Sequence, residues 1–128
     1  QVVKYLIIPD QHEQISKVLK KWSDEENLAL ILTTGGTGVS PSDQTPEATK
    51  QVIEKEIPGI CEMMRFQSFK KTPNALLSRA VAGIRKQSLI INLPGSLRGA
   101  RENLEVILPC LEHAIYKIQG GKKDCGEN

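Results

Sequence analysis

Leu30–Lys50 reads LILTTGGTGVSPSDQTPEATK and decides the fold of this chain. Its first five residues are aliphatic and β-branched types that favour a buried strand. Three glycines among residues 35–38 let the backbone turn tightly and approach a ligand closely. Thr45, Pro46 and Glu47 then predict a helix N-cap, a first helical position and an acidic first turn. A strand, a glycine-rich loop and a helix start in this order are typical of an anion-binding site.

The residues before this stretch predict a strand and a helix. Val2–Ile8 is an apolar run that we expect to be a strand, and residues 11–22 place apolar side chains at helical spacing. Asp10 is well placed as the N-cap of that helix. Residues 27–34 are nearly continuously apolar, which favours burial on both faces in a parallel sheet. Strand, helix and strand in this order imply a right-handed crossover.

The rest of the chain continues the alternation of helices and strands. We expect helices over 45–56, 60–69 and 73–78, strands over 80–84 and 88–93, and a helix over 99–118 that Pro109 kinks or divides. The predicted fold class is α/β, a three-layer α/β/α sandwich with a mostly parallel central sheet. We expect one domain over residues 1–120 and a flexible tail over 121–128.

Composition and charge exclude several classes of function. The chain has 128 residues, of which 39% are hydrophobic, and this suffices for a single core. A formal net charge of +2 gives no electrostatic case for nucleic acid as the main partner, and no apolar run is long enough to span a bilayer. The three cysteines are widely separated and fit neither a disulfide framework nor a metal site. We therefore expect a cytoplasmic protein with no nucleic-acid partner and no membrane insertion.

Three predicted strand ends carry polar residues that could meet in one crevice, where open α/β sheets bind ligands. They are Asp10, residues 35–43 and residues 92–96. The helix that begins near Pro46 would add a partial positive charge to this crevice. The loop has neither the lysine of a Walker A motif nor the spacing of a dinucleotide fingerprint, so a plain tight turn is the alternative interpretation. In the anion-binding interpretation, the ligand faces the backbone amides of Gly35, Gly36, Thr37 and Gly38.

Two carboxylates, Asp10 and Asp43, would stand at adjacent strand ends. As a pair they could hold Mg²⁺, which neutralises phosphate charge. The structural alternatives are a helix N-cap for Asp10 and a turn residue for Asp43. Ser78 and Arg79 offer a hydroxyl and a permanent cation suited to phosphate, or simply a polar pair that ends a helix.

Several motifs, taken in order and spacing, resemble the molybdopterin adenylyltransferase family. They are LILTTGGTG at 30–38, TPEATK at 45–50, LSR at 77–79, AGIR at 82–85 and LIINLPGS at 89–96. The likeness is closest to the eukaryotic G domains of gephyrin and of the plant two-domain molybdenum-cofactor enzyme, and it includes MogA-like proteins. It covers the chain nearly from end to end, and motifs in this order are highly specific.

This resemblance implies a reaction in which MgATP adenylylates the terminal phosphate of molybdopterin and pyrophosphate is released. Asp10 and Asp43 match the family's two essential aspartates, which act on the metal and the phosphates. Ser78 matches a serine implicated in holding the pterin. The resemblance thus implies Mg²⁺ as cofactor, ATP as co-substrate and molybdopterin as substrate. The ligand-binding positions that it implies are Gly35, Gly36, Thr37, Gly38, Thr45, Ser78, Arg79, Asn92, Pro94, Gly95 and Ser96.

The resemblance also implies a homotrimer and a molybdate-insertion domain, either in the same chain or in a separate protein. Family members normally begin with a further strand ahead of the position of Val2, so we expect this chain to be a fragment of a longer one. Ser42 stands where relatives commonly have arginine, which removes a possible charge beside the phosphates.

Two other functions stay open at this point. A non-catalytic molybdopterin-binding or scaffold domain of a gephyrin-like protein needs the fold and a trimer surface, but not two carboxylates at strand ends. A generic nucleotide-binding domain would bind nucleotide without responding to a pterin. The presence of Asp10, Asp43 and Ser78 together with the glycine-rich loop favours the enzyme.

Overall fold

The computed structural model describes residues 1–122. Helices and strands alternate along the chain, and no helix among the described residues is both long and apolar enough to cross a membrane. The elements are α1 (His12–Asp24), β1 (Leu30–Thr34), α2 (Thr45–Val52), β2 (Lys55–Glu56), α3 (Pro58–Phe69), the 3-10 helix η1 (Pro73–Leu77), β3 (Ala82–Arg85), β4 (Ser88–Leu93) and α4 (Leu97–Ile118).

The four strands form one sheet in the order β1-β4-β3-β2. β1 and β4 are parallel, with Leu30 opposite Leu89 and Thr34 opposite Leu93. β3 is antiparallel to both β4 and β2. The α/β class is therefore confirmed, but the expected mostly parallel sheet is wrong, because two of the three pairings are antiparallel. A tight turn causes this, since Lys86 takes a positive φ of 52° and reverses the chain between β3 and β4.

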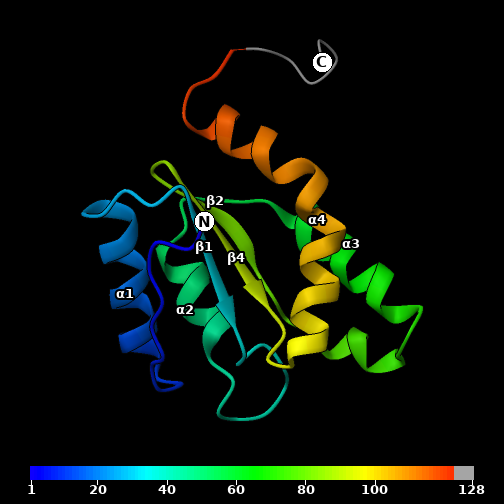
Figure 1. The fold of residues 1–128 in the computed structure, drawn as a ribbon. Helices are drawn as coiled ribbons and strands as arrows, with labels where there is room; N and C mark the ends of the chain where they lie inside the picture. Colours follow the sequence, from blue (N-terminus) through cyan, green and yellow to red (C-terminus); the bar gives the residue numbers. More distant parts are fainter. Residues whose placement is uncertain (123–128) are drawn as a thin grey trace.

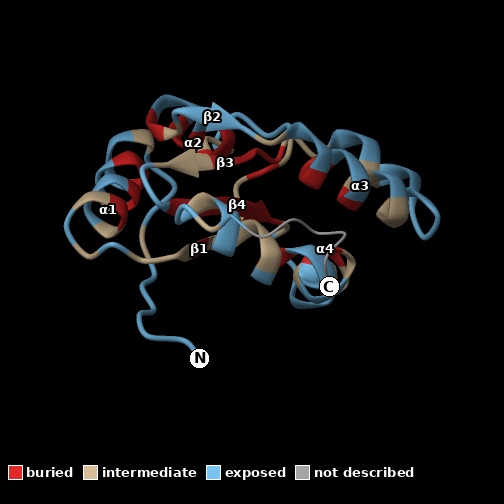
Figure 2. Ribbon diagram, turned by 90° about the horizontal axis from the view of Figure 1, so that it is seen from above, coloured by how far each residue is buried: buried red, intermediate tan, exposed pale blue. Residues whose placement is uncertain are grey.

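Two pairs of helices cover the two faces of the sheet, as Figure 1 shows, with α1 and α2 on one side and α3 and α4 on the other. β4 lies in the middle, and all six of its residues are buried (Figure 2). Leu89, Ile91 and Leu93 belong to the apolar cluster under α3 and α4, whereas Ile90 belongs to the cluster under α1 and α2. This alternation follows from the period of two residues in a strand. The predicted three-layer sandwich is confirmed.

The N-terminal segment differs from the prediction. Residues 1–9 contain no strand, and Val2, Val3, Tyr5 and Ile7 are between 68% and 81% exposed. An extended segment becomes a strand only when a neighbouring strand accepts its backbone hydrogen bonds, and no described strand pairs with this one. The right-handed crossover expected from it is therefore absent from the described residues.

Helix starts also differ from the prediction. The N-cap of α1 is Gln11 rather than Asp10, and the N-cap of α2 is Gln44, so that Thr45 is already helical. α3 begins at Pro58, where proline is tolerated because the first helical N–H has no intrahelical acceptor. The Ser96 hydroxyl accepts a hydrogen bond from the Gly99 amide and starts α4 at Leu97.

Helix ends are decided by contacts with other elements. α2 stops at Val52 instead of continuing to residue 56, because the Glu54 amide donates to the Ile84 carbonyl and the next residues pair with β3. α4 runs through Pro109 without division, although its axis bends along its length in Figure 1. The short helix after α3 and the strand at 88–93 are confirmed.

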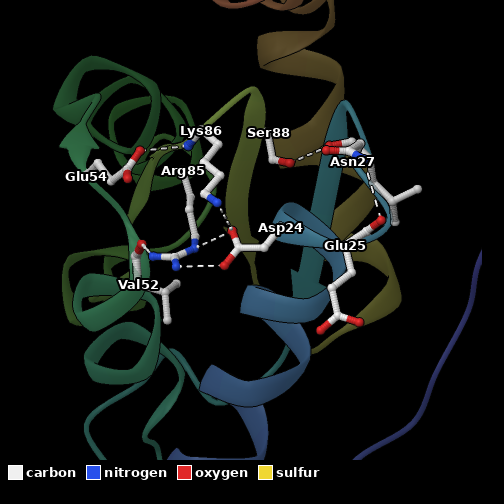
Figure 3. A network of polar contacts seen from close by, with 9 residues as sticks. Asp24, Glu25, Asn27, Val52, Glu54, Arg85, Lys86 and Ser88 are labelled. Carbon is white, nitrogen blue, oxygen red and sulfur yellow. Dashed lines mark hydrogen bonds and ion pairs between the residues drawn. The ribbon is translucent and has the colours of Figure 1, made fainter.

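A polar network ties the elements together at the end of the sheet where β1 and β4 begin (Figure 3). The Arg85 guanidinium donates from Nε and Nη2 to the two carboxylate oxygens of Asp24, at 3.0 and 2.9 Å, and from Nη1 to the Val52 carbonyl at 2.8 Å. Beside it, the Lys86 amide donates to Glu54 at 2.7 Å. The ends of α1 and α2 are thereby fixed to the β3–β4 turn, at the opposite end of the sheet from the glycine-rich loop.

Candidate active site at the carboxyl ends of β1 and β4

The loops that follow the two parallel strands touch each other. The Gly35 amide donates to the Leu93 carbonyl at 3.1 Å. A Cβ atom added to Gly95 would lie 3.2 Å from the Gly35 Cα, so the two backbones meet where a side chain would crowd them. The loops after β1 and β4 therefore lie side by side, and Gly95 packs on Gly35.

Both predicted carboxylates lie against the glycine-rich loop. A Cβ on Gly36, which has a positive φ of 69°, would stand 3.4 Å from Asp10 Oδ1 and would overlap Thr45 Oγ1. A Cβ on Gly38 would stand 2.9 Å from Asp43 Oδ2. The structure thus brings together Asp10, Asp43 and Thr45 around two glycines, and side chains at those glycines would collide with the polar groups.

Three loop amides have no hydrogen-bond acceptor among the described residues. Within residues 1–122, the amides of Gly36, Thr37 and Gly38 donate to no other residue. Gly35 differs from the prediction, because its amide is already used by the Leu93 carbonyl. Consecutive unpaired amides on a glycine-rich turn form a concave site that suits phosphate oxygens.

The start of α2 offers fewer donors than the sequence suggested. The Thr45 amide donates to the Gly36 carbonyl at 3.3 Å, and Pro46 has no amide hydrogen. These contacts close the loop onto the helix instead of leaving the first turn open. The amides without an acceptor therefore lie in the loop, and α2 supports the loop through Thr45.

The Arg79 guanidinium is fully engaged with the protein. Its Nε donates to the Gly38 carbonyl at 2.7 Å, its Nη2 donates to the Asp43 carbonyl at 2.9 Å, and its Nη1 pairs with Glu47. The Arg79 amide also donates to the Thr37 carbonyl at 2.8 Å. The hydrogen bond from Arg79 holds the pKa of Glu47 below its ordinary value. These contacts make Arg79 a clamp on the loop that carries Asp43 and leave none of its three guanidinium nitrogens without a protein acceptor.

Asp43 keeps part of its carboxylate available. Its Oδ2 accepts a hydrogen bond from the Ser40 amide at 3.0 Å, and its own amide donates back to the Ser40 carbonyl at 2.9 Å. The turn role considered for Asp43 is therefore real, and it orients the carboxylate without using its second oxygen. Asp10 is exposed and is not the N-cap of α1, so that alternative is wrong.

A cavity of about 300 Å³ opens beside the loop, between α3, η1 and the start of α4. Ser78, the residue before Arg79, lines this cavity. The Ser96 hydroxyl accepts a hydrogen bond from the Gly99 amide at 3.0 Å and thereby caps α4. The predicted site residues that line this cavity are Thr37, Gly38, Ser78, Asn92, Pro94 and Ser96.

Asn92 lines the cavity, and its side chain is hydrogen-bonded within the protein. It is fully buried, its Oδ1 accepts from the Val81 amide at 3.0 Å, and its Nδ2 donates to the hydroxyls of Thr33 and Thr49 at 2.9 and 3.0 Å. All of its side-chain donors and its acceptor have partners in the protein. Asn92 therefore joins β1, α2 and β4 behind the site, and its side chain has no donor left for a ligand.

The walls contributed by α3 and η1 were missed by the sequence analysis. Arg65 and Lys71 line the cavity from α3 and the turn after it, and Asn74 lines it from η1. The sequence of an amphipathic helix with scattered cations does not indicate which of its faces borders a cavity, because this depends on how the helix packs in the fold. Cys61 also lines it, and burial raises the pKa of its thiol to about 11, which keeps it protonated and unreactive near neutral pH.

A larger but shallower hollow, of about 430 Å³, lies between α1 and α2. It contains none of the residues predicted for the site, and its polar groups are surface side chains of the two helices. The cavity beside the glycine-rich loop is therefore the candidate site.

The fit to a metal rests on two carboxylates. Within residues 1–122 no group of three or more His, Cys, Asp or Glu side chains is arranged to hold an ion. Mg²⁺ commonly binds through one or two carboxylates together with water and substrate phosphates. Asp10 at Gly36 and Asp43 at Gly38 are the two carboxylates that would hold the metal in that mode, together with a phosphorylated ligand.

Comparison with known proteins gives a consistent picture. A probable molybdopterin binding domain matches residues 1–113. Molybdopterin adenylyltransferase of Helicobacter pylori (strain J99) is 46% identical over 123 residues, which make up 96% of this chain and 70% of that protein. Gephyrin of Dictyostelium discoideum is 46% identical over 122 residues, so this chain spans 17% of that longer protein.

A solved structure agrees with the sequence comparison. The molybdopterin biosynthesis enzyme MoaB of Thermus thermophilus superimposes with a TM-score of 0.89 at 51% identity, over 97% of this chain and 78% of that one. The family match covers most of the chain, including the glycine-rich loop, both carboxylates and the cavity. The chain therefore belongs to the family of molybdopterin-binding domains.

Proposed function

We propose that this chain is a molybdopterin adenylyltransferase domain, which transfers AMP from MgATP to molybdopterin and releases pyrophosphate. The observation that carries the proposal is a glycine-rich loop with three amides that have no acceptor, with Asp10 against Gly36 and Asp43 against Gly38, whose Thr37 and Gly38 line a cavity of about 300 Å³. The names of the similar enzymes from Helicobacter pylori and Escherichia coli support the same activity. A scaffold would need neither the carboxylates nor the free amides.

The chemistry is transfer at phosphorus. An oxygen of the molybdopterin phosphate forms a bond to the α-phosphorus of ATP, the bond from that phosphorus to the bridging oxygen breaks, and pyrophosphate leaves with the electron pair. Catalysis of this kind depends on positioning and charge neutralisation more than on proton transfer. The protein's part is to hold two polyanions side by side.

Each group of residues has a proposed task in this step. Asp10 and Asp43 hold Mg²⁺, which would neutralise the nucleotide phosphates. The amides of Gly36, Thr37 and Gly38 bind phosphate oxygens, and Thr45 and Gly95 keep the loop in shape. Arg79 acts on the loop through Gly38 and Asp43 rather than on the ligand.

The cavity receives the pterin in this proposal. Ser78 offers a hydroxyl at its wall, while Met64 and Ala80 provide apolar surface for a flat ring. Such a cavity, mostly apolar with a few polar groups, is typical of small-molecule sites.

Three finer parts of the proposal concern the setting of the protein. We propose a homotrimer in the cytoplasm, whose product passes to a molybdate-insertion domain in the same chain or in another protein. Exposed apolar side chains on α3, Met63, Phe66 and Phe69, support association with further copies. Light scattering of the purified protein measures the number of copies directly.

The test of function is AMP transfer to molybdopterin, followed by pyrophosphate release. We expect release that depends on both MgATP and molybdopterin, and we expect Asp43→Asn to reduce it by at least about a hundredfold with little change in thermal stability, because the carboxylate lies at the surface of the loop. Glu105→Gln is the matched control, since Glu105 is exposed on α4 away from the cavity. Molybdopterin binding without any pyrophosphate release would favour the scaffold alternative, and normal turnover by Asp43→Asn would refute the metal role.

A further inference from the structure

Arg65 is a half-buried cation in the wall of the cavity. The other arginine and lysine side chains around it have carboxylate partners: Lys71 and Arg98 share Glu102, and Arg79 pairs with Glu47. Arg65 pairs with no carboxylate of residues 1–122. It is therefore the uncompensated charge of the cavity wall.

Only one edge of the Arg65 guanidinium is used by the protein. Its Nη1 donates two long hydrogen bonds, to the Ser78 carbonyl at 3.4 Å and to the Ala80 carbonyl at 3.3 Å. Its Nε and Nη2 donate to no described residue. These N–H groups form the fork that matches two oxygens of a phosphate or carboxylate.

A charge in this position calls for a counter-ion. Holding a cation partly out of water costs free energy unless an anion or several hydrogen bonds compensate it. The protein supplies two long hydrogen bonds and no carboxylate, so an anionic group that enters the cavity would meet an uncompensated cation at Arg65. Phosphate is the oxyanion that the proposed substrate carries.

The position of Arg65 also relates it to the loop that binds nucleotide. Arg65 holds the carbonyls of Ser78 and Ala80, and the residue between them, Arg79, clamps Gly38 and Asp43. The segment 78–80 therefore contacts the Arg65 guanidinium through its carbonyls and the loop of the proposed metal site through Arg79. An anion bound by Arg65 lies on the cavity side of this segment, and the nucleotide phosphates lie at its loop side.

We propose that Arg65 binds the terminal phosphate of the pterin substrate and thereby selects the phosphorylated form. The inference rests on the proposed function, because it takes molybdopterin as the ligand of the cavity. Arg65 is a binding and specificity residue in this assignment, and it presents the phosphate oxygen to the α-phosphorus of ATP.

The test compares binding of molybdopterin with binding of its dephosphorylated form. The wild-type protein should prefer the phosphorylated ligand. Arg65→Gln should weaken binding of the phosphorylated ligand by about 10- to 150-fold, the range expected for a lost hydrogen bond to a charged group, and should leave the dephosphorylated ligand unaffected. Arg65→Lys should retain part of the preference, because it keeps the charge and loses the fork. Arg101→Gln is the control, since Arg101 is exposed on α4 and does not line the cavity.

The outcomes separate failure of the inference from failure of the proposed function. Equal weakening for both ligands would mean that Arg65 only supports the Ser78–Ala80 backbone, and an unchanged preference in Arg65→Gln would place the phosphate elsewhere. If the wild-type protein binds neither ligand, the proposed function fails. The anion site is then tested separately, by titrating the protein with inorganic phosphate and following the Arg65 Nε–H resonance. A saturable shift of that resonance supports the site, and the absence of a shift refutes it.

Discussion

Arg79 shows how a single side chain can organise the loop of the candidate site. A cation beside a serine at the end of a helix suggested phosphate binding, yet its three guanidinium nitrogens bond to Gly38, Asp43 and Glu47. The loop is also held by the Gly35 and Thr45 amides, and the Ser40 amide orients the Asp43 carboxylate. Arg79 adds the contacts that fix the carbonyls of Gly38 and Asp43 relative to Glu47.

Replacing Arg79 by lysine should loosen this loop while the charge is kept. A lysine ammonium cannot reach both carbonyls and Glu47 at once, so we expect amide hydrogen exchange of residues 36–43 to be about tenfold faster and AMP transfer to fall with it. Arg98→Lys serves as the control, because Arg98 is exposed and its side chain forms an ion pair with Glu102 alone within residues 1–122. Lost transfer with unchanged exchange would instead indicate that Arg79 touches phosphate directly.

At the scale of elements, the network at the opposite end of the sheet fixes three separate segments. Arg85 joins Asp24 at the end of α1 to Val52 at the end of α2, as Figure 3 shows. The hydrogen bond from Arg85 lowers the pKa of the Asp24 carboxyl, and in turn Asp24 raises the pKa of Arg85. The partners are 61 residues apart in sequence, so the network stabilises the tertiary arrangement of the helices and not one helix alone.

This network predicts a pH-dependent contribution to stability. Because the folded-state pKa of Asp24 lies below its unfolded value, the stabilisation is present above about pH 4 and is lost as the pH falls through the lowered pKa. Asp24→Asn should therefore lower the urea midpoint at about pH 7, and the difference from wild type should shrink at about pH 3. Glu105→Gln, on an exposed side chain without an ion pair among the described residues, should show no difference at either pH. If Asp24→Asn lowers the urea midpoint by the same amount at both pH values, the assignment of the ion pair is contradicted.

At the scale of the whole molecule, β4 is the structural centre. It contributes side chains to both apolar clusters, and its Asn92 joins it to β1 and α2. The loop after β4 also packs on the glycine-rich loop through Gly95. Damage to this strand should therefore reduce global stability and disturb the site together.

Leu89→Ala tests the central role of β4. Leu89 is fully buried in the cluster under α3 and α4, and its truncation should reduce the free energy of unfolding by about 2–5 kcal/mol. Leu97→Ala removes the same atoms from a side chain that is 79% exposed, and it should change stability by less than about 0.5 kcal/mol. Equal effects in chemical denaturation would mean that the apolar cluster is not the source of stability.

Much of the architecture followed from local sequence. The strand at 88–93, the glycine-rich loop, the short helix η1 and the three-layer arrangement were predicted from residue type and periodicity. The two carboxylates were predicted at adjacent strand ends. Asp10 and Asp43 do lie against the loop, but Asp10 does not follow a strand, so its position there comes from tertiary packing. Val2–Ile8 was predicted as a strand from composition alone, and it is not one, because strand formation requires a partner.

The sequence alone determined most of the helices, the strands β1, β3 and β4 and the glycine-rich loop, but not the conformation of residues 2–8 and 53–56. These properties depend on local conformational preference and on hydrophobic period, which a sequence states directly. Only the tertiary structure decided that β3 runs antiparallel to β4 and that Arg79 holds the loop. It also decided that the Asn92 side chain is hydrogen-bonded inside the core and that Arg65 lines the cavity without a carboxylate partner among the described residues. Those outcomes depend on contacts between residues far apart in the chain, whose pairing is settled by packing in space.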